Sequence, residues 1–496
     1  MSRRLLAFDL GAESGRALVA EWDGQRLQLH LVHRFPNGPV RLPDGLYWDA
    51  LRLFEEILQA MRKAREQFGT LASLGIDTWG VDFALLGRGG VLLGNPRHYR
   101  DPHTEGIFDY AFARASREEI FHATGIQFMR LNTLFQLLAL QRYRSPLLEV
   151  AETMLMMADL FHFWLTGRKS MELTNASTTQ MYDPVARDWA RPLLQKLNLP
   201  IHILPPINSP GTVLGTVLPH IADATGCKDM PVVLPATHDT ASAVAAVPAE
   251  GGKWCYISSG TWSLVGVETS QPVIDARTLA YNFTNEIGYG HSVRLLKNVM
   301  GLWLVQECRR SWERTGESYS YEELTRLAEA APPRQAFVDP DDASFLLPVS
   351  MPSAVAEYCR KTGQAVPQTP GELVRVCLES LALKYRWVIE RLEELLGQRL
   401  EVIHVVGGGS QNRLLNQLTA DCCNRLVLAG PVEATSVGNV LVQMLGLGWL
   451  ASLEEARAVV RQSFRMERYE PREHAVWDEA YNRFQKLIAN SPAMVG

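Results

Sequence analysis

The sequence of 496 residues lacks the patterns that mark several large classes of protein. It has no Lys/Arg run of the kind that binds nucleic acid, and the formal net charge of −5 also disfavours a DNA or RNA partner. No apolar stretch is long enough to span a bilayer, and Asp9 interrupts the N-terminal apolar run that could imitate a signal peptide. These absences predict a soluble globular protein with no nucleic-acid partner and no membrane partner.

Cysteine is also scarce, with seven residues in the whole chain and no CxxC pair. Cys422 and Cys423 are adjacent in the sequence, which suits neither a disulfide framework nor a zinc site. The pattern predicts free thiols in a reducing compartment, so the expected location is the cytoplasm.

The sequence contains no Walker motif, GxxxxGK[ST], which disfavours a P-loop enzyme. Gly407-Gly408-Gly409 follows an apolar run but does not match GxGxxG, and three glycines alone are more typical of a tight strand-to-helix turn. Any nucleotide therefore has to be held by other turns, with the triple-glycine loop packing against its adenine or ribose.

Two strand–turn–strand patterns offer such turns, about 250 residues apart. In the first, apolar runs at 5–8 and 17–20 flank a turn, residues 9–16, rich in glycine, serine and arginine. Glycines 11 and 15 let backbone N–H groups approach a phosphate, and Asp9 at the strand end can hold Mg²⁺ through water. The second pattern, residues 254–267, repeats the plan. Each copy alone is equally well explained as an ordinary hairpin.

Hydrophobic patterning predicts an α/β protein. After the first hairpin, residues 27–32 alternate as a third strand, and Asp49 caps a helix whose expected apolar face is Leu51, Phe54, Leu58 and Met61. A buried strand at 74–77 completes the order β-β-β-α-β. The C-terminal half follows a similar plan, with a helix over 373–396 ended by Gly397 and a strand at 402–406. The loop-like stretch 248–252 predicts two domains, 1–248 and 249–496.

Residues 232–246, between the two hairpins, are the stretch in which we expect the chemistry. The pattern predicts a strand, a short loop and an alanine-rich helix, with Asp239 at the helix N-terminus. There the helix dipole favours an ionised carboxylate of ordinary pKa, which can accept a proton from a hydroxyl during phosphoryl transfer. The alternative is that Asp239 merely caps the helix and His238 is an ordinary loop histidine.

Several of these motifs together resemble the FGGY carbohydrate kinases. The motifs are Asp9-Leu10-Gly11 with Ser14-Gly15-Arg16, residues 76–83, Ser209-Pro210-Gly211, His238-Asp239-Thr240, residues 258–263 and Gly407-Gly408-Gly409, in the family's order over nearly the whole chain. Residues 75–83, 174–180 and 296–303 most resemble the group of this family that acts on L-rhamnulose.

The resemblance implies two actin-like (ribonuclease H-like, ASKHA) α/β domains with a catalytic cleft between them. It also implies phosphorylation of the 1-hydroxyl of L-rhamnulose by ATP with Mg²⁺. By motif, Asp239 is the proton acceptor, and the sugar contacts are Gly80, His238, Asp239, Thr240 and Asn298. The implied ATP contacts are Ala12, Glu13, Ser14, Gly15, Arg16, Thr261, Gln306 and Gly408. Of Trp79 and Phe83, at least one is expected to be a core aromatic.

Two positions depart from the family pattern. Glu13 stands in the first turn where a small residue is more usual, which brings an anionic side chain to a polyphosphate loop. Some relatives carry a paired cysteine after the triple-glycine loop, but here Cys422 and Cys423 cannot form a bridge of that spacing. L-Fuculose or a pentulose remains open as the substrate. An actin-like ATPase without kinase activity remains open as the alternative function. Both a monomer and a homodimer remain open as the oligomeric state.

Overall fold

The structure is a computed structural model that describes residues 3–489. The chain divides into two compact units. The first holds residues 1–248, 268–295 and 434–465, and the second holds the remaining residues. The chain thus passes from the first unit to the second after Pro248, next to the boundary predicted from the sequence, and later returns twice to the first unit.

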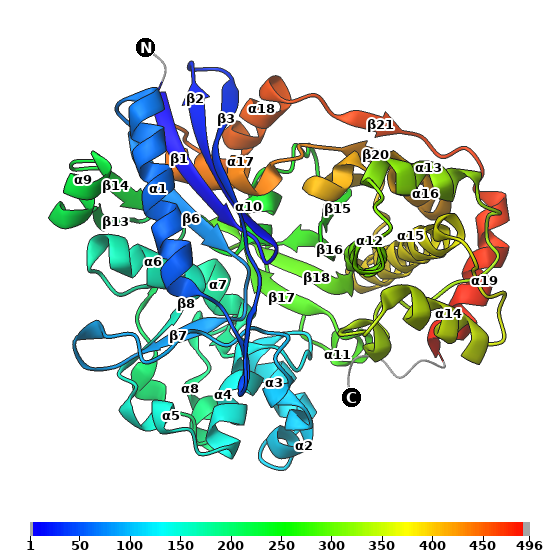
Figure 1. The fold of residues 1–496 in the computed structure, drawn as a ribbon, viewed down its shortest axis with the longest axis horizontal. Helices are drawn as coiled ribbons and strands as arrows, with labels where there is room; N and C mark the ends of the chain where they lie inside the picture. Colours follow the sequence, from blue (N-terminus) through cyan, green and yellow to red (C-terminus); the bar gives the residue numbers. More distant parts are fainter. Residues whose placement is uncertain (1–2, 490–496) are drawn as a thin grey trace. The chain divides into compact units, whose positions relative to one another are not determined.

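The first unit is built on a six-stranded sheet (Figure 1) with the order β13-β14-β6-β1-β2-β3. Its strands are β1 (Arg3–Leu10), β2 (Ser14–Trp22), β3 (Leu27–Pro36), β6 (Ser73–Thr78), β13 (Val213–Thr216) and β14 (Pro231–Val233). β1 pairs with β2 antiparallel and with β6 parallel, and β6 pairs with β14 parallel. The third antiparallel strand predicted at 27–32 is confirmed and extends to Pro36.

Helices cover the sheet because its strands are apolar on both faces. Helix α1 (Ala50–Phe68) packs against β1–β3, while α17 (Ala434–Gly446) packs against β1 and β6, and α10 (Asp239–Ala245) packs on α17. Asp49 caps α1 as expected, accepting a hydrogen bond from the Arg52 amide. The predicted apolar face was wrong by about one residue.

The buried stripe of α1 consists of Ala50, Leu53, Ile57, Ala60, Met61 and Ala64. Leu51 is 64% exposed, and Phe54 and Leu58 are only half-buried. Small alanines on the inner face let the helix lie close to the strands. The predicted face contained only large apolar residues and no alanine. A short hairpin, β4 (Val40–Leu42) and β5 (Gly45–Tyr47), also stands between β3 and α1 where none was predicted.

The rest of the first unit lies mostly between β6 and β13. Around Phe108, Phe128 and Phe135 the helices of this region form a separate aromatic core with edge-to-face contacts. The helices and strands between β6 and β13 are β7 (Phe83–Leu86), α2 (Ile107–Phe112), α3 (Arg117–Thr124), α4 (Thr133–Arg142), α5 (Pro146–Val150), β8 (Thr153–Met156), α6 (Met157–Thr166), β9 (Met171–Glu172), α7 (Leu173–Thr178), β10 (Tyr182–Asp183), β11 (Asp188–Trp189), α8 (Arg191–Lys196) and β12 (Ile207–Asn208). Helix α9 (Pro219–Thr225) follows β13 in the chain. Later segments add α11 (Ala276–Tyr281), β17 (Thr284–Ile287) and α18 (Leu453–Ser463).

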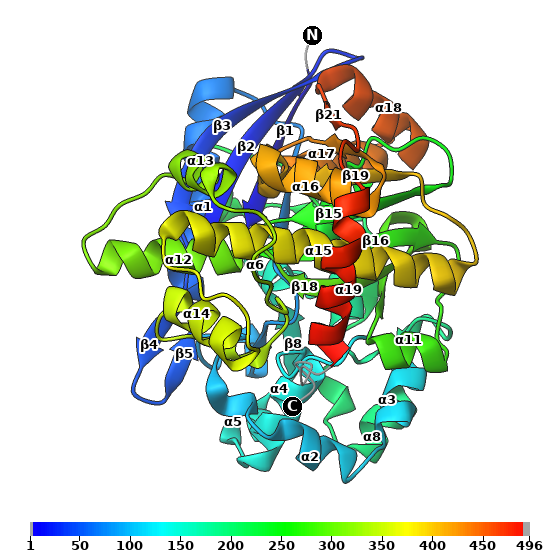
Figure 2. The ribbon, with the colours of Figure 1, turned by 90° about the vertical axis from the view of Figure 1, so that its right-hand side faces the viewer.

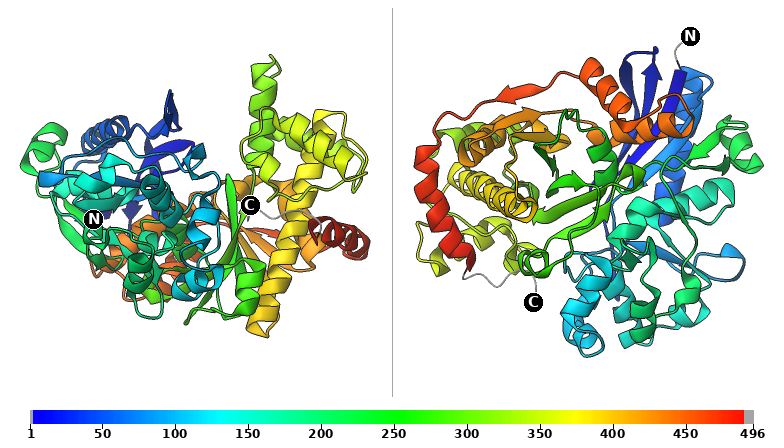
Figure 3. Two further views of the ribbon diagram at one scale, coloured as in Figure 1. Left: turned by 90° about the horizontal axis from the view of Figure 1, so that it is seen from below. Right: turned by 180° about the vertical axis from the view of Figure 1, so that it is seen from behind.

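In the second unit the strands run in the order β18-β16-β15-β19-β20-β21. They are β15 (Trp254–Ser259), β16 (Trp262–Thr269), β18 (Val293–Met300), β19 (Val402–Val406), β20 (Leu426–Ala429) and β21 (Glu467–Tyr469). The long α15 (Pro370–Leu396) packs against α16 (Arg413–Cys423) and α19 (Ala475–Ala489), as Figure 2 shows, and ends at Gly397 as predicted. The remaining helices are α12 (Trp303–Arg314), α13 (Tyr321–Ala330) and α14 (Met351–Lys361). After β21 comes α19, the red helix in the right-hand view of Figure 3.

The two sheets follow one plan. β15 pairs with β16 antiparallel and with β19 parallel, and β19 pairs with β20 parallel, as β1 does with β2 and β6, and β6 with β14. In each sheet, therefore, the first strand of an antiparallel hairpin also pairs in parallel with a strand from later in the chain. The predicted α/β class with two domains of the same plan is confirmed.

Two further sequence-based expectations can be checked directly. All seven cysteines are free and buried. Within residues 3–489, no helix combines the length and the apolar character needed to cross a membrane.

The contact between α10 and α17 yields a stability prediction. A Cβ atom at Gly438 would stand 1.7 Å from the backbone oxygen of Ser242, so neither helix could keep its place. We expect Gly438→Ala to lower the free energy of unfolding by about 1–3 kcal/mol, measured by urea denaturation. Gly94→Ala is the control, because a Cβ atom there meets no neighbour within 4 Å. Equal stability of the two variants would show that the helices do not pack this closely.

Candidate functional site

The first hairpin is present, but its turn is residues 11–13, shorter than the predicted 9–16, because β1 runs to Leu10 and β2 begins at Ser14. Gly11 N donates to Ser14 O at 3.0 Å, and the Asn37 side-chain amide donates to Gly11 O at 2.8 Å, which ties the turn to the end of β3. Gly15 has a different reason from the one expected: a Cβ atom there would lie 2.3 Å from the Phe35 ring. Ser14, Gly15 and Arg16 already belong to β2, and the Gly15 position is set by core packing.

Two carboxyl groups lie side by side at the ends of neighbouring strands. β1 and β6 are parallel and in register, so Asp9 pairs with Asp77, and both are buried. Asp9 Oδ2 lies 3.1 Å from Arg16 Nε, and Asp77 Oδ2 accepts a hydrogen bond from the Asn439 amide at 2.6 Å. Burial, and then the nearby Asp9 charge, raise the pKa of Asp77 well above its ordinary value. The two carboxyl groups therefore differ in their partners: Asp9 faces a cation, and Asp77 accepts from a neutral amide.

Asp239 follows a short loop beside these strand ends. Thr78 N donates to Thr237 O at 2.9 Å, so the loop continues the edge of β6. His238 is the N-cap of α10 and Asp239 its first residue, as predicted. Asp239 Oδ1 accepts from the Thr240 amide at 2.6 Å and from the Thr240 hydroxyl at 3.3 Å.

The pKa of Asp239 differs from the ordinary value expected for a helix N-terminus. Burial raises this pKa, and the neighbouring His238 opposes the shift. The side chain keeps 30% exposure, so one part of the carboxyl group reaches solvent. In the described part of the chain, Oδ2 accepts no hydrogen bond, which leaves one oxygen able to take a proton.

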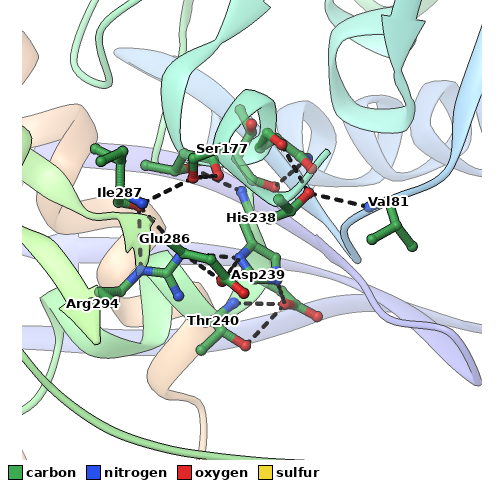
Figure 4. Close-up of polar contacts among 12 residues, drawn as sticks. Val81, Ser177, His238, Asp239, Thr240, Glu286, Ile287 and Arg294 are labelled. Atoms are coloured by element: carbon green, nitrogen blue, oxygen red, sulfur yellow. Dashed lines mark hydrogen bonds and ion pairs between the residues drawn. The ribbon is translucent and has the colours of Figure 1, made fainter. Parts of the chain in front are cut away.

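His238 lies between Asp239 and a buried ion pair, as Figure 4 shows. Its Nε2 is 3.4 Å from Asp239 Oδ1, and its Nδ1 is 3.1 Å from Arg294 Nη2 and 3.4 Å from Glu286 Oε2. Glu286 comes from β17 and Arg294 from β18, and the two side chains are paired at 3.2 Å. Arg294 is fully buried and also donates to Ile287 O.

A buried glutamate holds the loop from the other side. Glu172 accepts hydrogen bonds from the amides of Thr174 at 2.9 Å and Thr237 at 3.0 Å, and from the hydroxyls of the same two threonines at 2.5 and 2.6 Å. The Asn175 amide adds a fifth at 3.3 Å. His238 N in turn donates to Thr174 Oγ1 at 3.2 Å. One carboxylate thus joins the start of α7 to the residue before His238.

Gly80 lies in a second loop, between β6 and β7. A Cβ atom at Gly80 would meet Thr178 at 3.1 Å, and the next residue, Val81, has a φ of 65°, which is rare for a β-branched side chain. The Thr178 hydroxyl accepts from Val81 N at 3.3 Å. Close packing on α7 therefore fixes this loop.

The buried carboxyl group of Asp82 organises the wall behind Gly80. It accepts from the indole nitrogens of Trp48 at 2.5 Å and Trp79 at 3.0 Å, and from the Gln136 amide at 2.9 Å. Burial raises the pKa of Asp82 to about 7 against these donors. Trp79 and Phe83 are both buried, which confirms the expectation of a core aromatic.

The second hairpin forms a turn that supports α12. Thr261 O accepts from the amides of Gly301 and Trp303, each at 3.1 Å, so the turn caps the helix start. Gln306 lies on the first turn of α12, and its Oε1 is buried and accepts no hydrogen bond from residues 3–489. A buried acceptor without a donor suits a bound ligand. Asn298 lies near the end of β18, half-buried.

The triple-glycine loop has two glycines required by packing and one that is not. Gly407 has a φ of 84°, and a Cβ atom at Gly409 would lie 2.0 Å from Ser259 Oγ. Gly408 has no neighbour within 4 Å of such an atom. The loop is therefore a tight strand-to-helix turn, as three glycines predict, and Gly408 is the position open to a ligand.

Sequence reasoning missed three charged residues of this site. Glu172, Glu286 and Arg294 stand at 0%, 4% and 0% exposure. Each occurs within or next to an apolar run, where a charged residue needs a partner. That signal was present in the sequence, but their partners come from segments distant in the chain.

Comparison with known protein families also divides the chain into an N-terminal and a C-terminal part. Residues 4–246 match the N-terminal domain of the FGGY family of carbohydrate kinases, and residues 255–447 match its C-terminal domain. The rhamnulokinase of Bacteroides thetaiotaomicron is 43% identical over 98% of this chain and 100% of its own length. The rhamnulokinase of Enterococcus faecalis is 40% identical over 99% and 98%.

Solved structures share the fold at low sequence identity. A xylulose kinase from Lactobacillus acidophilus has a TM-score of 0.82 at 17% identity, covering 98% of each chain. A glycerol kinase from Plasmodium falciparum, solved with ADP, has a TM-score of 0.79 at 17% identity, covering 99% of this chain and 98% of that one.

The hydrogen bonds to Glu172 predict that even the conservative substitution Glu172→Gln lowers the stability of the protein. In Glu172→Gln one side-chain oxygen becomes an N–H donor that faces other donors, so the free energy of unfolding should fall by about 1–3 kcal/mol, measured by chemical denaturation. Glu66→Gln on the exposed face of α1 is the matched control and should change stability by less than about 0.5 kcal/mol. A Glu172→Gln protein as stable as the control would mean that the five hydrogen bonds are not formed.

Proposed function

The chain belongs to the FGGY family of carbohydrate kinases, and we propose that it transfers the γ-phosphoryl group of ATP to the 1-hydroxyl of L-rhamnulose. The products are L-rhamnulose 1-phosphate and ADP, which places the enzyme in L-rhamnose catabolism. The observation that carries the substrate is the match to rhamnulokinases over nearly the full length of both chains. The motifs at 75–83 and 174–180 support the same choice, because both line the Asp239 loop through Thr78 and Thr174.

Asp239 is the proposed proton acceptor. Oδ1 is occupied by Thr240 and faces His238, and Oδ2 is available to the 1-hydroxyl of the sugar. As the hydroxyl oxygen bonds to the γ-phosphorus and the bond to the ADP oxygen breaks, the hydroxyl proton passes to Oδ2. A loose transition state needs only late proton removal, so positioning contributes more than basicity.

The proposed sugar contacts are Gly80, His238, Thr240 and Asn298. Their side chains and backbone supply the donors and acceptors that hydroxyl groups require, and Gly80 allows close approach. For ATP the proposed contacts are the turn from Ala12 through Glu13, Ser14 and Gly15 to Arg16, together with Thr261, Gln306 and Gly408. The buried, unsatisfied Gln306 oxygen and the open space at Gly408 support two of these.

Mg²⁺ fits the first hairpin as an ion held mainly by phosphate and water. Residues 3–489 contain no group of three or more His, Cys, Asp or Glu residues that could hold a metal. Asp9 offers a single buried carboxyl group, and Mg²⁺ in nucleotide sites commonly uses one or two carboxylates and keeps several waters. When bound, the ion would neutralise charge that develops on the phosphates.

Location in the cytoplasm is also part of this proposal.

The substrate is tested with a panel of sugars. ADP release with MgATP should be fastest with L-rhamnulose among L-rhamnulose, L-fuculose, L-ribulose, D-xylulose and no sugar. Asp239→Asn should lower kcat by about 10²–10⁴-fold because the proton acceptor is removed. Comparable rates on a pentulose would contradict the substrate, and turnover without sugar that survives the mutation would contradict the kinase assignment.

The raised pKa of Asp239 predicts a gain in stability for the same inactive variant. A raised pKa means that the folded state binds a proton more tightly than the unfolded state, so stability falls as pH rises from about 4 through the folded pKa. Asn cannot ionise and escapes this cost. Asp239→Asn should therefore melt at a higher temperature than wild type at pH 7, with the difference shrinking toward pH 4 in a thermal melting series. A lower Tm at pH 7 would contradict the direction of the shift.

A further inference from the structure

The contacts of His238 determine where its proton lies. Arg294 Nη2 is 3.1 Å from His238 Nδ1, and a guanidinium group can only donate hydrogen bonds. Nδ1 must therefore be an acceptor without a proton. The neutral imidazole then carries its proton on Nε2, the nitrogen that lies 3.4 Å from Asp239 Oδ1.

The alternative tautomer conflicts with the same geometry. A proton on Nδ1 could point to Glu286 Oε2 at 3.4 Å, but it would also face the closer guanidinium N–H. The two hydrogens of Arg294 Nη2 are directed to His238 Nδ1 and Ile287 O, so Glu286 Oε2, 3.2 Å from Nη2, pairs with the guanidinium by charge rather than by a hydrogen bond. The contact with Arg294 therefore leaves Nδ1 as the acceptor.

We propose that Arg294 and Glu286 are positioning residues that hold His238 as the Nε2–H tautomer, so that its Nε2–H group faces Asp239 Oδ1 and orients that carboxyl group. The inference rests on the proposed role of Asp239 in phosphoryl transfer. Oδ1 accepts hydrogen bonds from Thr240 and lies 3.4 Å from His238 Nε2, so Oδ2 is the oxygen presented to the sugar. Arg294 touches neither reacting atom in this scheme and acts through the imidazole.

Arg294 suits this role because burial and hydrogen bonds hold its guanidinium group in one position. Its side chain is fully buried, and Nε and Nη2 both donate to Ile287 O, at 3.3 and 3.2 Å. Ile287 N in turn donates to Ser177 Oγ at 2.9 Å, on the α7 segment that Glu172 caps. The guanidinium is therefore fixed by backbone on one side and by Glu286 on another.

The test reads the tautomer directly in the full chain without substrate. With ¹⁵N-histidine labelling, the His238 signals among the twelve histidines are identified by their loss in His238→Gln. Wild type should show an unprotonated Nδ1 and a protonated Nε2. A wild-type Nδ1 that carries the proton would overturn the inference, even if rhamnulose activity is found, because the measurement involves neither sugar nor ATP.

Variants connect the tautomer to the reaction. Arg294→Met should move the His238 signals toward the other tautomer and lower kcat by at least about 10-fold, with little change in KM for ATP. Arg375→Met is the matched control, because Arg375 likewise joins a buried glutamate, Glu379, to a backbone oxygen. The control should leave both the His238 signals and kcat unchanged, even if its stability falls.

One further measurement keeps the inference falsifiable if Arg294→Met does not fold. Arg294→Lys retains a donor-only cation, so it should keep the Nε2–H tautomer and lower kcat by less than about 10-fold. A proton on His238 Nδ1 in Arg294→Lys, or unchanged His238 signals in a folded Arg294→Met, would contradict the role.

Discussion

The buried carboxylate of Glu172 is the constraint on which the catalytic loop depends. It accepts hydrogen bonds from Thr174 at the start of α7 and from Thr237, the residue before His238, which lies 65 residues further along the chain than Glu172. Burial of a carboxylate is costly, and here five donors offset that cost while fixing the backbone that leads to Asp239. Because His238 N also bonds to Thr174, the position of the imidazole follows from the same contact.

A second layer of buried charge surrounds that loop. Asp9 is matched by Arg16, Asp77 by a neutral amide, and His238 by the Arg294–Glu286 pair. Removing one member of such a set leaves its partner buried and unpaired, so the charges specify the arrangement more than they add to stability. The result is a cluster of carboxyl groups at the ends of parallel strands, in which burial raises the pKa of both Asp77 and Asp239.

Local signals in the sequence were sufficient for much of the fold. Glycine turns and alternating runs identified both hairpins, Asp49 and Gly397 marked helix ends, and the strand at 402–406 has those same bounds in the structure. The face of α1 was misjudged because alanine carries little weight in a hydrophobic pattern. The hairpin of β4 and β5 was missed because each strand has only three residues.

The site was only partly predictable for a different reason. Asp239 and His238 stand next to each other in a recognisable loop, so residue type and position pointed to them. Glu172 contacts Thr237 across 65 residues of chain and Arg294 contacts His238 across 56, and no spacing rule connects such residues. The expected ordinary pKa of Asp239 was wrong because the dipole argument considered the helix and not the burial around it.

The central claim is that Asp239 Oδ2 receives the proton of the 1-hydroxyl of L-rhamnulose. A crystal structure with L-rhamnulose and a non-hydrolysable ATP analogue measures that relation directly. The account predicts the 1-hydroxyl within about 2.6–3.2 Å of Oδ2, with Oδ1 still bonded to Thr240. A sugar bound with a different hydroxyl at this position, or with its 1-hydroxyl directed away from Asp239, would contradict it.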